Sequence, residues 1–215
     1  MDYKKRWLNS YRDIKKPPHW ALDLEPSKFA EKFVAALKKR KLKEYKILEI
    51  GCGNGRDSLF FAENGFNVTS IDISQNALIL AGKNKQAYLF KNTLPGDLTF
   101  HQADAEALPF KDEKFDAVYS LSVLHSADLK KSFEQIYRVL KIGGVAWLHL
   151  GQKTFFLTEN KIEEHCSPEK LKSVLNNLPF KILEFKSDIA MKKIDYDDEE
   201  KNPHRHFAII VKLKK

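Results

Sequence analysis

A glycine-rich segment and one acid that follows it have the residue types and the spacing of a ligand site. The run KILEIGCGNGR, from Lys46 to Arg56, sets glycines directly after an apolar stretch, and Asp72 ends a second apolar stretch 21 residues after Gly51. Glycines after a buried strand let the backbone approach a ligand, and an acid at about this spacing can accept hydrogen bonds from a ribose diol. The segment therefore predicts a strand, a ligand-binding turn and the start of a helix.

The spacing of the glycines bears on which ligand the turn can hold. A dinucleotide fingerprint has glycines at G-x-G-x-x-G, whereas here the third step falls on Arg56 and the glycines are Gly51, Gly53 and Gly55. The turn is therefore less suited to a pyrophosphate at a helix N-terminus than to a smaller nucleoside ligand. An NAD-dependent oxidoreductase is disfavoured for the same reason.

Apolar periodicity predicts the elements that must position this turn. Continuous apolar stretches predict strands at 45–50, 67–72, 98–102, 115–123 and 145–150. Helical spacing predicts helices through 59–62, from Ser74 to 80 and over 133–140, and another that Pro26 and Ser27 open. Alternating strands and helices, with strands that are apolar throughout, indicate a parallel sheet covered on both faces.

The last third of the sequence departs from that alternation. A helical pattern at 171–178 is followed by two apolar stretches, 180–185 and 207–213, without a helix between them. The polar connector from Asp195 to Pro203 suits a hairpin better than a crossover. We therefore expect the last strand to be antiparallel to the others.

Composition indicates a globular domain of ordinary size. The 215 residues are 43% hydrophobic and 31% charged, which is typical of one folded domain. Two cysteines, Cys52 and Cys166, are too few for a disulfide framework or a four-thiolate zinc site and suggest a reducing compartment. The start of the sequence lacks the apolar core of a secretory signal, and no apolar run approaches membrane-spanning length, so we expect a cytoplasmic protein.

The net charge of +8 raises the question of nucleic acid as a partner. The lysines are spread over several expected helix ends and chain ends, and no aromatic residues alternate with them in the way that stacks bases. A solvated surface is the favoured interpretation, and nucleic acid is not the expected partner.

Five segments, taken in order, resemble class I S-adenosylmethionine-dependent methyltransferases. They are the turn EIGCGNG from Glu49 to Gly55, the acid Asp72, the pair Asp104-Ala105 before LPF, the strand FDAVYS from Phe115 to Ser120, and the turn LKIGG from Leu140 to Gly144. One glycine turn alone is weakly specific, but five elements in the family's order are strongly so. The resemblance covers about residues 45–150.

The resemblance, together with the alternation described above, implies one α/β domain with a Rossmann-like, seven-stranded, mostly parallel sheet, helices on both faces and an antiparallel last strand. Residues 1–41 would be an N-terminal helical appendage or lid, residues 42–151 the donor-binding core, and residues 152–215 an acceptor-side helix and the terminal hairpin.

The resemblance also implies roles for individual residues, with S-adenosyl-L-methionine as the methyl donor. Asp72 would accept hydrogen bonds from the ribose, Asp104 would accept from the adenine amino group, and the residues from Leu121 to Val123 would wall the sulfonium. Cys52 is expected to be a small buried filler of the turn and not a nucleophile. The expected donor-binding residues are Glu49, Gly51, Cys52, Gly53, Asn54, Asp72, Ile73, Asp104, Ala105 and Leu121.

The methyl acceptor is less well specified. A soft thiol or metalloid acceptor needs no protein base, whereas an amine or hydroxyl must lose a proton. His125 is the candidate base because it follows the fourth strand, although a packing role fits it as well; His149 is expected to be a core residue. No metal site is expected, because His165 with Cys166, and His204 with His206, lack further ligands. Aromatic residues outside the shared core suggest an apolar acceptor pocket or ordinary packing: Trp7, Tyr11, Trp20, Phe155 and Phe156.

The expected function is methyl transfer to a small molecule, and the chain looks similar to the tellurite-resistance and thiopurine-type branch. Two alternatives stay open. One is methylation of RNA or protein, which the positive charge motivates, and the other is a non-catalytic, methyltransferase-like binding subunit. The oligomeric state cannot be read from the sequence.

Overall fold

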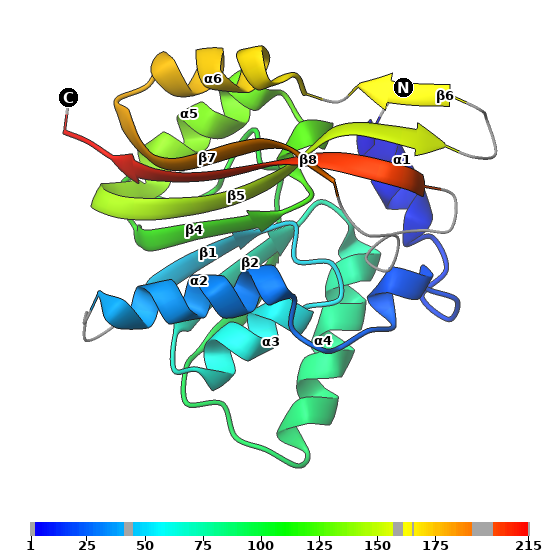
Figure 1. Ribbon diagram of the computed structural model, residues 1–215. Helices are drawn as coiled ribbons and strands as arrows, with labels where there is room; N and C mark the ends of the chain where they lie inside the picture. The colour runs from blue at the N-terminus through cyan, green and yellow to red at the C-terminus, as the bar shows by residue number, and fades with distance from the viewer. Residues whose placement is uncertain (1–2, 41–44, 157–160, 165, 191–199, 215) are drawn as a thin grey trace.

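The chain folds into one twisted sheet flanked by helices. A computed structural model describes residues 3–40, 45–156, 161–164, 166–190 and 200–214 (Figure 1). Within them the main sheet has the strand order β3-β2-β1-β4-β5-β8-β7, and β6 pairs with β5 outside this path. The expected seven-stranded, mostly parallel sheet is therefore confirmed, with one short additional strand.

The parallel part of the sheet fixes where the expected ligand turn lies. β1 (Lys46–Ile50), β2 (Asn67–Asp72), β3 (Leu98–Gln102) and β4 (Phe115–Leu121) run in the same direction. Ile50 pairs with both Ile71 and Ser120, so the carboxyl ends of β1, β2 and β4 meet at one edge. Because the chain leaves β1 toward β2 on one side and β4 lies on the other, this edge is the point where strand order reverses.

The terminal hairpin is also confirmed. β8 (Glu200–Lys212) lies between β5 (Leu140–Phe156) and β7 (Phe180–Ala190) and is antiparallel to both. The hairpin is longer than expected, because β8 begins at Glu200, inside the polar stretch predicted to be a connector; residues 195–199 of that stretch lie outside the described residues. β6 (Lys161–Glu164), which the sequence did not predict, pairs with the outer end of β5.

Several predicted strand boundaries were wrong. β5 runs to Phe156 and not to 150, and β7 runs to Ala190 and not to 185. β4 ends at Leu121 and not at 123, because Ser122 adopts a left-handed φ of 58° and a short 3-10 turn follows at Leu124–Ser126. β5 begins at Leu140 and not at 145, so the Gly143-Gly144 pair lies inside the strand, where Gly143 has a φ of 76°. The parallel pairing of β4 and β5 is accordingly irregular between Phe115 and Ala117.

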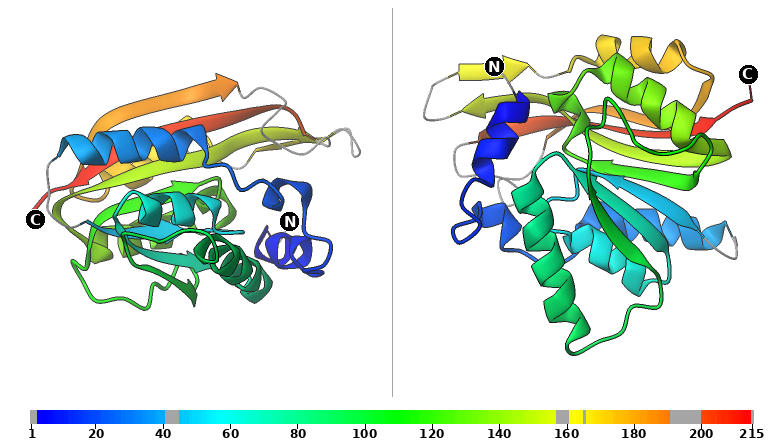
Figure 2. Two further views of the ribbon diagram at one scale, coloured as in Figure 1. Left: turned by 90° about the horizontal axis from the view of Figure 1, so that it is seen from below. Right: turned by 180° about the vertical axis from the view of Figure 1, so that it is seen from behind.

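Helices cover both faces of the sheet (Figure 2). α2 (Lys28–Lys39) and α3 (Arg56–Glu63) pack on one face through an apolar cluster that includes Phe33, Phe61 and Tyr119. α5 (Leu129–Val139) and α6 (Pro168–Asn176) pack on the other through a cluster that includes Phe133, Ile136 and Leu171. α4 (Gln75–Leu89) follows β2, and its N-cap Ser74 accepts from the Ala77 N–H as predicted.

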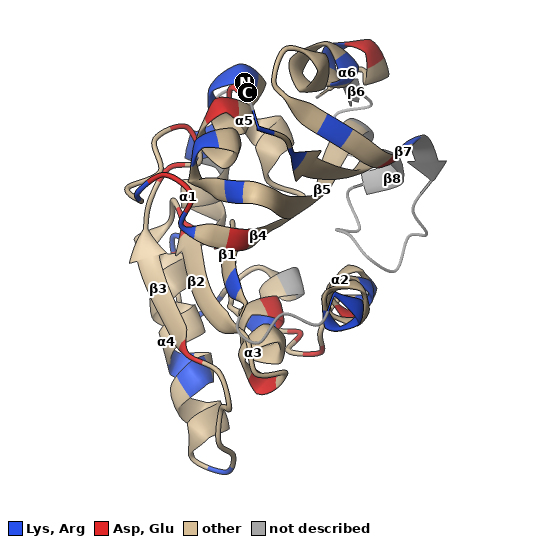
Figure 3. Cartoon of the chain, turned by 90° about the vertical axis from the view of Figure 1, so that its left-hand side faces the viewer, with Lys and Arg blue, Asp and Glu red and all other residues tan. Residues whose placement is uncertain are grey.

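The N-terminal segment lies apart from these layers. α1 (Tyr3–Ser10) sits beyond the strand ends, on the side where β1, β2 and β4 finish (Figure 1). Basic and acidic residues are interspersed over several elements in the view of Figure 3. Within the described part of the chain, none of the helices is both long and apolar enough to cross a membrane.

Candidate functional site

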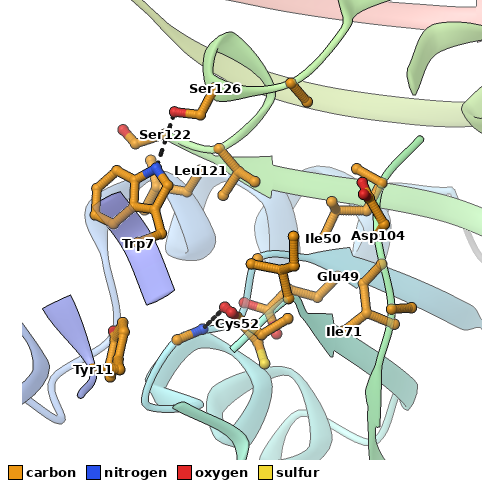
Figure 4. A pocket seen from close by; sticks show the side chains of 18 of the residues that line it. Trp7, Tyr11, Glu49, Ile50, Cys52, Ile71, Asp104, Leu121, Ser122 and Ser126 are labelled. Atoms are coloured by element: carbon orange, nitrogen blue, oxygen red, sulfur yellow. Dashed lines mark hydrogen bonds between the residues drawn. The ribbon is translucent and has the colours of Figure 1, made fainter. Parts of the chain in front are cut away.

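A cavity of about 420 Å³ lies at the carboxyl ends of β1, β2 and β4, between these strand ends and α1 (Figure 4). All ten residues predicted to hold a donor line it: Glu49, Gly51, Cys52, Gly53, Asn54, Asp72, Ile73, Asp104, Ala105 and Leu121. Ser122 and Val123, which were expected to wall the sulfonium together with Leu121, line it too. The sequence did not predict several further lining residues: Lys4, Ser10, Ile50, Arg56, Asp57, Ile71, Ala103, Ser126 and Ala127. The structure thus brings the predicted residues together, and their role in binding stays a prediction.

The glycine turn has a shape that only glycine tolerates. Gly51 has a φ of 77°, and a Cβ atom there would lie 2.1 Å from Cγ2 of Val123. Gly53 has a φ of 53°, and a Cβ there would lie 2.8 Å from the Tyr11 hydroxyl. Positive φ and close neighbours together exclude a side chain, so the turn presents bare backbone to the cavity.

Asp72 is held by the turn and by the start of the next helix. Its Oδ2 accepts the Gly53 backbone N–H at 2.9 Å, and its Oδ1 accepts the Ser74 N–H at 2.9 Å. Burial raises the pKa of Asp72 despite these N–H donors. Each carboxylate oxygen has a second lone pair, so the held carboxylate can still accept from a diol.

Glu49 is a deeply buried acid of the site, with 3% of its surface exposed. Its Oε2 accepts from the Ser58 hydroxyl, in a very short contact, and from the Ser70 hydroxyl at 2.9 Å. Burial, followed by the charge of Asp57, raises the pKa of Glu49 to about 8. The sequence indicated Glu49 but gave no sign that two serines from α3 and β2 would hold it.

Asp104 faces the N-terminal helix. Its Oδ2 accepts from the Lys4 ammonium at 2.7 Å, and its Oδ1 accepts the Glu106 N–H at 3.0 Å. Lys4 also pairs with the Glu106 carboxylate at 2.6 Å. Partial burial acts to raise the pKa of Asp104, but the Glu106 N–H and the Lys4 ammonium hold that pKa below its ordinary value.

The N-terminal segment closes the cavity through several contacts. Trp7 Nε1 donates to the Ser126 hydroxyl at 3.0 Å, and Tyr11, with 7% of its surface exposed, lies against Gly53. Asn54 points its amide at this segment and not at the cavity, because its Nδ2 donates to the carbonyls of Ala21 and Asp23. Trp7 and Tyr11, two of the aromatic residues suggested for an acceptor pocket, line this cavity. The side chains of the other three, Trp20, Phe155 and Phe156, lie outside what the structure describes.

His125 does not line the cavity, although it follows β4 as predicted. Its Nδ1 accepts the Gly151 N–H at 3.0 Å, and its ring lies against the Gly151 Cα. The structure therefore does not bring His125 together with the other predicted site residues, and its role as a base stays a prediction. His149 is buried, as expected of a core residue.

No metal centre emerges from the described residues, in which no three His, Cys, Asp or Glu side chains gather suitably. The side chains of His165, His204 and His206 lie outside what the structure describes. Cys52 and Cys166 are both buried thiols that form no disulfide, and burial raises the pKa of each. A high thiol pKa fits the expectation that Cys52 is a filler and not a nucleophile.

The fold is an open α/β sheet of the Rossmann-like class. A glycine turn, an acid at the end of the second strand and a cavity meet where the strand order reverses, which is where such sheets bind nucleosides. Comparison with known proteins narrows this class. The profile of the methyltransferase domain family matches residues 48–148. A SAM-dependent methyltransferase of Methanosarcina mazei has a similar structure, with a TM-score of 0.70 over 84% of this chain and 98% of that one, at 23% identity.

Curated relatives agree with the profile. An O-methyltransferase of Aspergillus nomiae is 29% identical over 65% of this chain and 66% of its own length. A malonyl-[acyl-carrier protein] O-methyltransferase of Enterobacter lignolyticus is 34% identical over 46% of this chain and 36% of its own length. This chain spans less than two thirds of either relative.

Over residues 48–148 this chain is therefore similar to the methyltransferase domain family, and its fold is that of a solved SAM-dependent methyltransferase. The finer similarity to the tellurite-resistance and thiopurine-type branch stays a prediction.

Proposed function

We propose that this chain is an S-adenosylmethionine-dependent methyltransferase that acts on a small molecule by in-line methyl transfer. The observation that carries the proposal is one cavity that joins a bare-backbone turn at Gly51 and Gly53 to two acids, Asp72 and Asp104. Each acid sits at the end of a different strand, at the edge where open sheets bind nucleosides.

The lining fits the methyl donor part by part. The backbone at Gly51 and Gly53 accommodates the methionine portion, since no Cβ narrows the space there. Asp72 accepts the ribose hydroxyls, and Asp104, beside Ala105, accepts from the adenine amino group. Bound S-adenosylmethionine supplies a methyl group already activated by a sulfonium, so the main task of the protein is to hold an acceptor in line, which can contribute ~7–11 kcal/mol.

The enclosure of the cavity supports a small acceptor. Its volume of about 420 Å³ is within the range of small-molecule sites, which is roughly 300–1,000 Å³. Lys4, Trp7 and Tyr11 of the N-terminal segment cover it, so a polymer would have to displace α1 to reach the strand ends. A cytoplasmic location is part of the proposal and rests on two cysteines that form no disulfide.

Transfer of a radiolabelled methyl group tests the proposal. We expect label to reach at least one member of a panel of small thiols, amines and hydroxyl compounds, and calorimetry to detect binding of S-adenosylhomocysteine. Label on tRNA, with binding that weakens steeply as salt rises, would favour RNA methylation instead. Tight binding of S-adenosylhomocysteine without transfer to any acceptor would favour a non-catalytic subunit.

A further inference from the structure

Ser122 has an unusual backbone conformation at the wall of the cavity. It follows β4 directly, lines the cavity and has a φ of 58°, in the left-handed region that residues other than glycine rarely adopt. Such a conformation costs about 1–3 kcal/mol and persists where the surroundings hold it, often at functional sites. Here the Ser122 N–H donates to the His149 carbonyl at 2.8 Å, which ties this residue to β5.

The side chains of the same two residues also meet. Ser122 Oγ lies 3.2 Å from His149 Nδ1. Only 6% of the His149 surface is exposed, and its ring packs against that of Phe29, with centroids 5.5 Å apart. The imidazole is thus buried behind a hydroxyl that belongs to the cavity wall.

Ser122 lies at the other end of the cavity from Asp104. Figure 4 shows Ser122 near Trp7 and Ser126, whereas Glu49, Ile71 and Asp104 gather on the other side. If Asp104 and Asp72 hold the nucleoside, as the proposed function requires, the space beside Ser122 is left for the methyl acceptor.

We propose that Ser122 and His149 form a proton relay for an acceptor hydroxyl group. The inference rests on the proposed function and deepens it by naming the acceptor class. A hydroxyl is the acceptor that gains most from such a relay, because it is a poor nucleophile until its proton leaves, whereas a thiol or metalloid anion needs no base.

The step balances as follows. The acceptor oxygen forms a bond to the methyl carbon while the bond from that carbon to sulfur breaks, and its electron pair stays on sulfur. The acceptor proton passes to Ser122 Oγ as the Ser122 hydroxyl proton passes to His149 Nδ1, which leaves an imidazolium. The relay therefore requires the neutral tautomer in which Nε2 carries the proton and Nδ1 accepts. After the product leaves, the proton returns through Ser122 to solvent.

Nitrogen-15 NMR of the ligand-free protein tests this requirement without any turnover. We expect the His149 signals, assigned by their loss in His149→Gln, to show a proton on Nε2 and an accepting Nδ1 at neutral pH. In Ser122→Ala the Nδ1 resonance should shift, while the exposed His101, which has a comparable contact to Thr99 at 3.3 Å, should keep its signals. A proton on Nδ1 of His149 would overturn the relay.

Kinetics with phenols of graded acidity test the acceptor class. We expect Ser122→Ala and His149→Gln to lower kcat at least about 100-fold for weakly acidic phenols, which is the low end of general-base effects, and far less for nitrophenols that are already ionised. The affinity for S-adenosylhomocysteine should stay within about threefold, well below the effect of one lost hydrogen bond to a charged group. His101→Gln is the matched control and should behave as the unmodified protein.

Equal losses over the whole phenol series would overturn the relay, as would transfer by the unmodified protein to thiols but to no hydroxyl compound. Failure of the unmodified protein to bind S-adenosylhomocysteine would count against the proposed function itself, which keeps the two failures distinguishable.

Discussion

The Gly53 backbone N–H donates to Asp72 Oδ2 at 2.9 Å, so the glycine turn after β1 and the acid that ends β2 form one hydrogen-bonded unit. The contact fixes the carboxylate of Asp72 relative to the bare backbone of the turn. A ligand that touches both therefore meets a preformed surface, because little ordering is left to occur on binding.

Asp72→Ala tests this unit directly. We expect affinity for S-adenosylmethionine to fall by at least ~1 kcal/mol, the scale of a lost hydrogen bond, when measured by calorimetry. Asp97→Ala, at an exposed acid far from the cavity, serves as the control and should leave affinity unchanged. Unchanged affinity in a folded Asp72→Ala protein would contradict the ribose role.

Gly51→Ala should damage the turn more than an ordinary glycine substitution. The new Cβ would meet both a φ of 77° and Val123 Cγ2 at 2.1 Å, so we expect unfolding free energy to fall by ~2 kcal/mol or more, with loss of donor binding. Gly65→Ala is the matched control, because Gly65 has a φ of 85° with open space around it and should cost only about 1 kcal/mol. Urea unfolding of both variants measures the difference, and equal costs would show that the contact with Val123 is unimportant.

Glu49 should make the stability of the ligand-free protein depend on pH. The pKa of Glu49 is raised from its ordinary value of 4.5 to about 8 in the folded protein, so the folded state keeps a proton that the unfolded state has lost between these pH values. Its contribution is therefore fully present below about pH 4.5 and declines as pH rises through about 8. The limiting slope for one such group is about 1.4 kcal/mol per pH unit.

Urea unfolding at several pH values between 5 and 8.5 measures this dependence, with Glu49→Gln as the comparison. The glutamine keeps the acceptor oxygen but cannot titrate, so its stability should decline less with pH. Parallel curves for the two proteins would mean that Glu49 titrates normally.

The bond between Trp7 and Ser126 should control how firmly α1 covers the cavity. Trp7→Phe and Ser126→Ala each remove the 3.0 Å contact, and we expect each to speed release of S-adenosylhomocysteine by about two- to tenfold, on the scale of one hydrogen bond. The double variant should be no worse than either single variant, because both remove the same bond. Leu8→Ala, on an exposed position of α1, is the control. Stopped-flow fluorescence measures the release rates. If the free-energy effects of the two substitutions add in the double variant, the two side chains do not act through one shared bond.

His125 should act through the position of β5. Its Nδ1 accepts the Gly151 N–H, so we expect His125→Ala to lower the unfolding free energy by about 1 kcal/mol. His125→Asn retains a possible acceptor but no base, and turnover should stay within tenfold of the unmodified protein. A loss of 10²-fold or more at unchanged donor affinity would instead support the base role predicted from the sequence.

The parallel core could be predicted from the sequence because local patterns and tertiary packing agree there. β2 and β3 have the predicted boundaries, 67–72 and 98–102. The hydroxyl of Ser74 caps α4 by accepting the N–H of Ala77, only three residues further along, so the local sequence alone indicates this contact.

The remaining features depend on contacts between distant residues. Nothing near Lys4 indicates that its ammonium will lie 2.7 Å from Asp104, one hundred residues further along. The left-handed Ser122 is similarly invisible in LSVLHS, because its conformation depends on the Ser122 N–H bond to His149 across the sheet. The hydrogen bond from the Gly151 N–H to His125 also joins residues far apart in the sequence, so the prediction of His125 as a site residue could not anticipate it.

A crystal structure with S-adenosylhomocysteine bound tests the central claim most directly. We predict both ribose hydroxyls within hydrogen-bond distance of the Asp72 carboxylate, the adenine amino group at Asp104, and the sulfur directed toward the end of the cavity that Ser122 lines. A nucleoside bound elsewhere, or none at saturating concentration, would contradict the assignment of this cavity as the methyl-donor site.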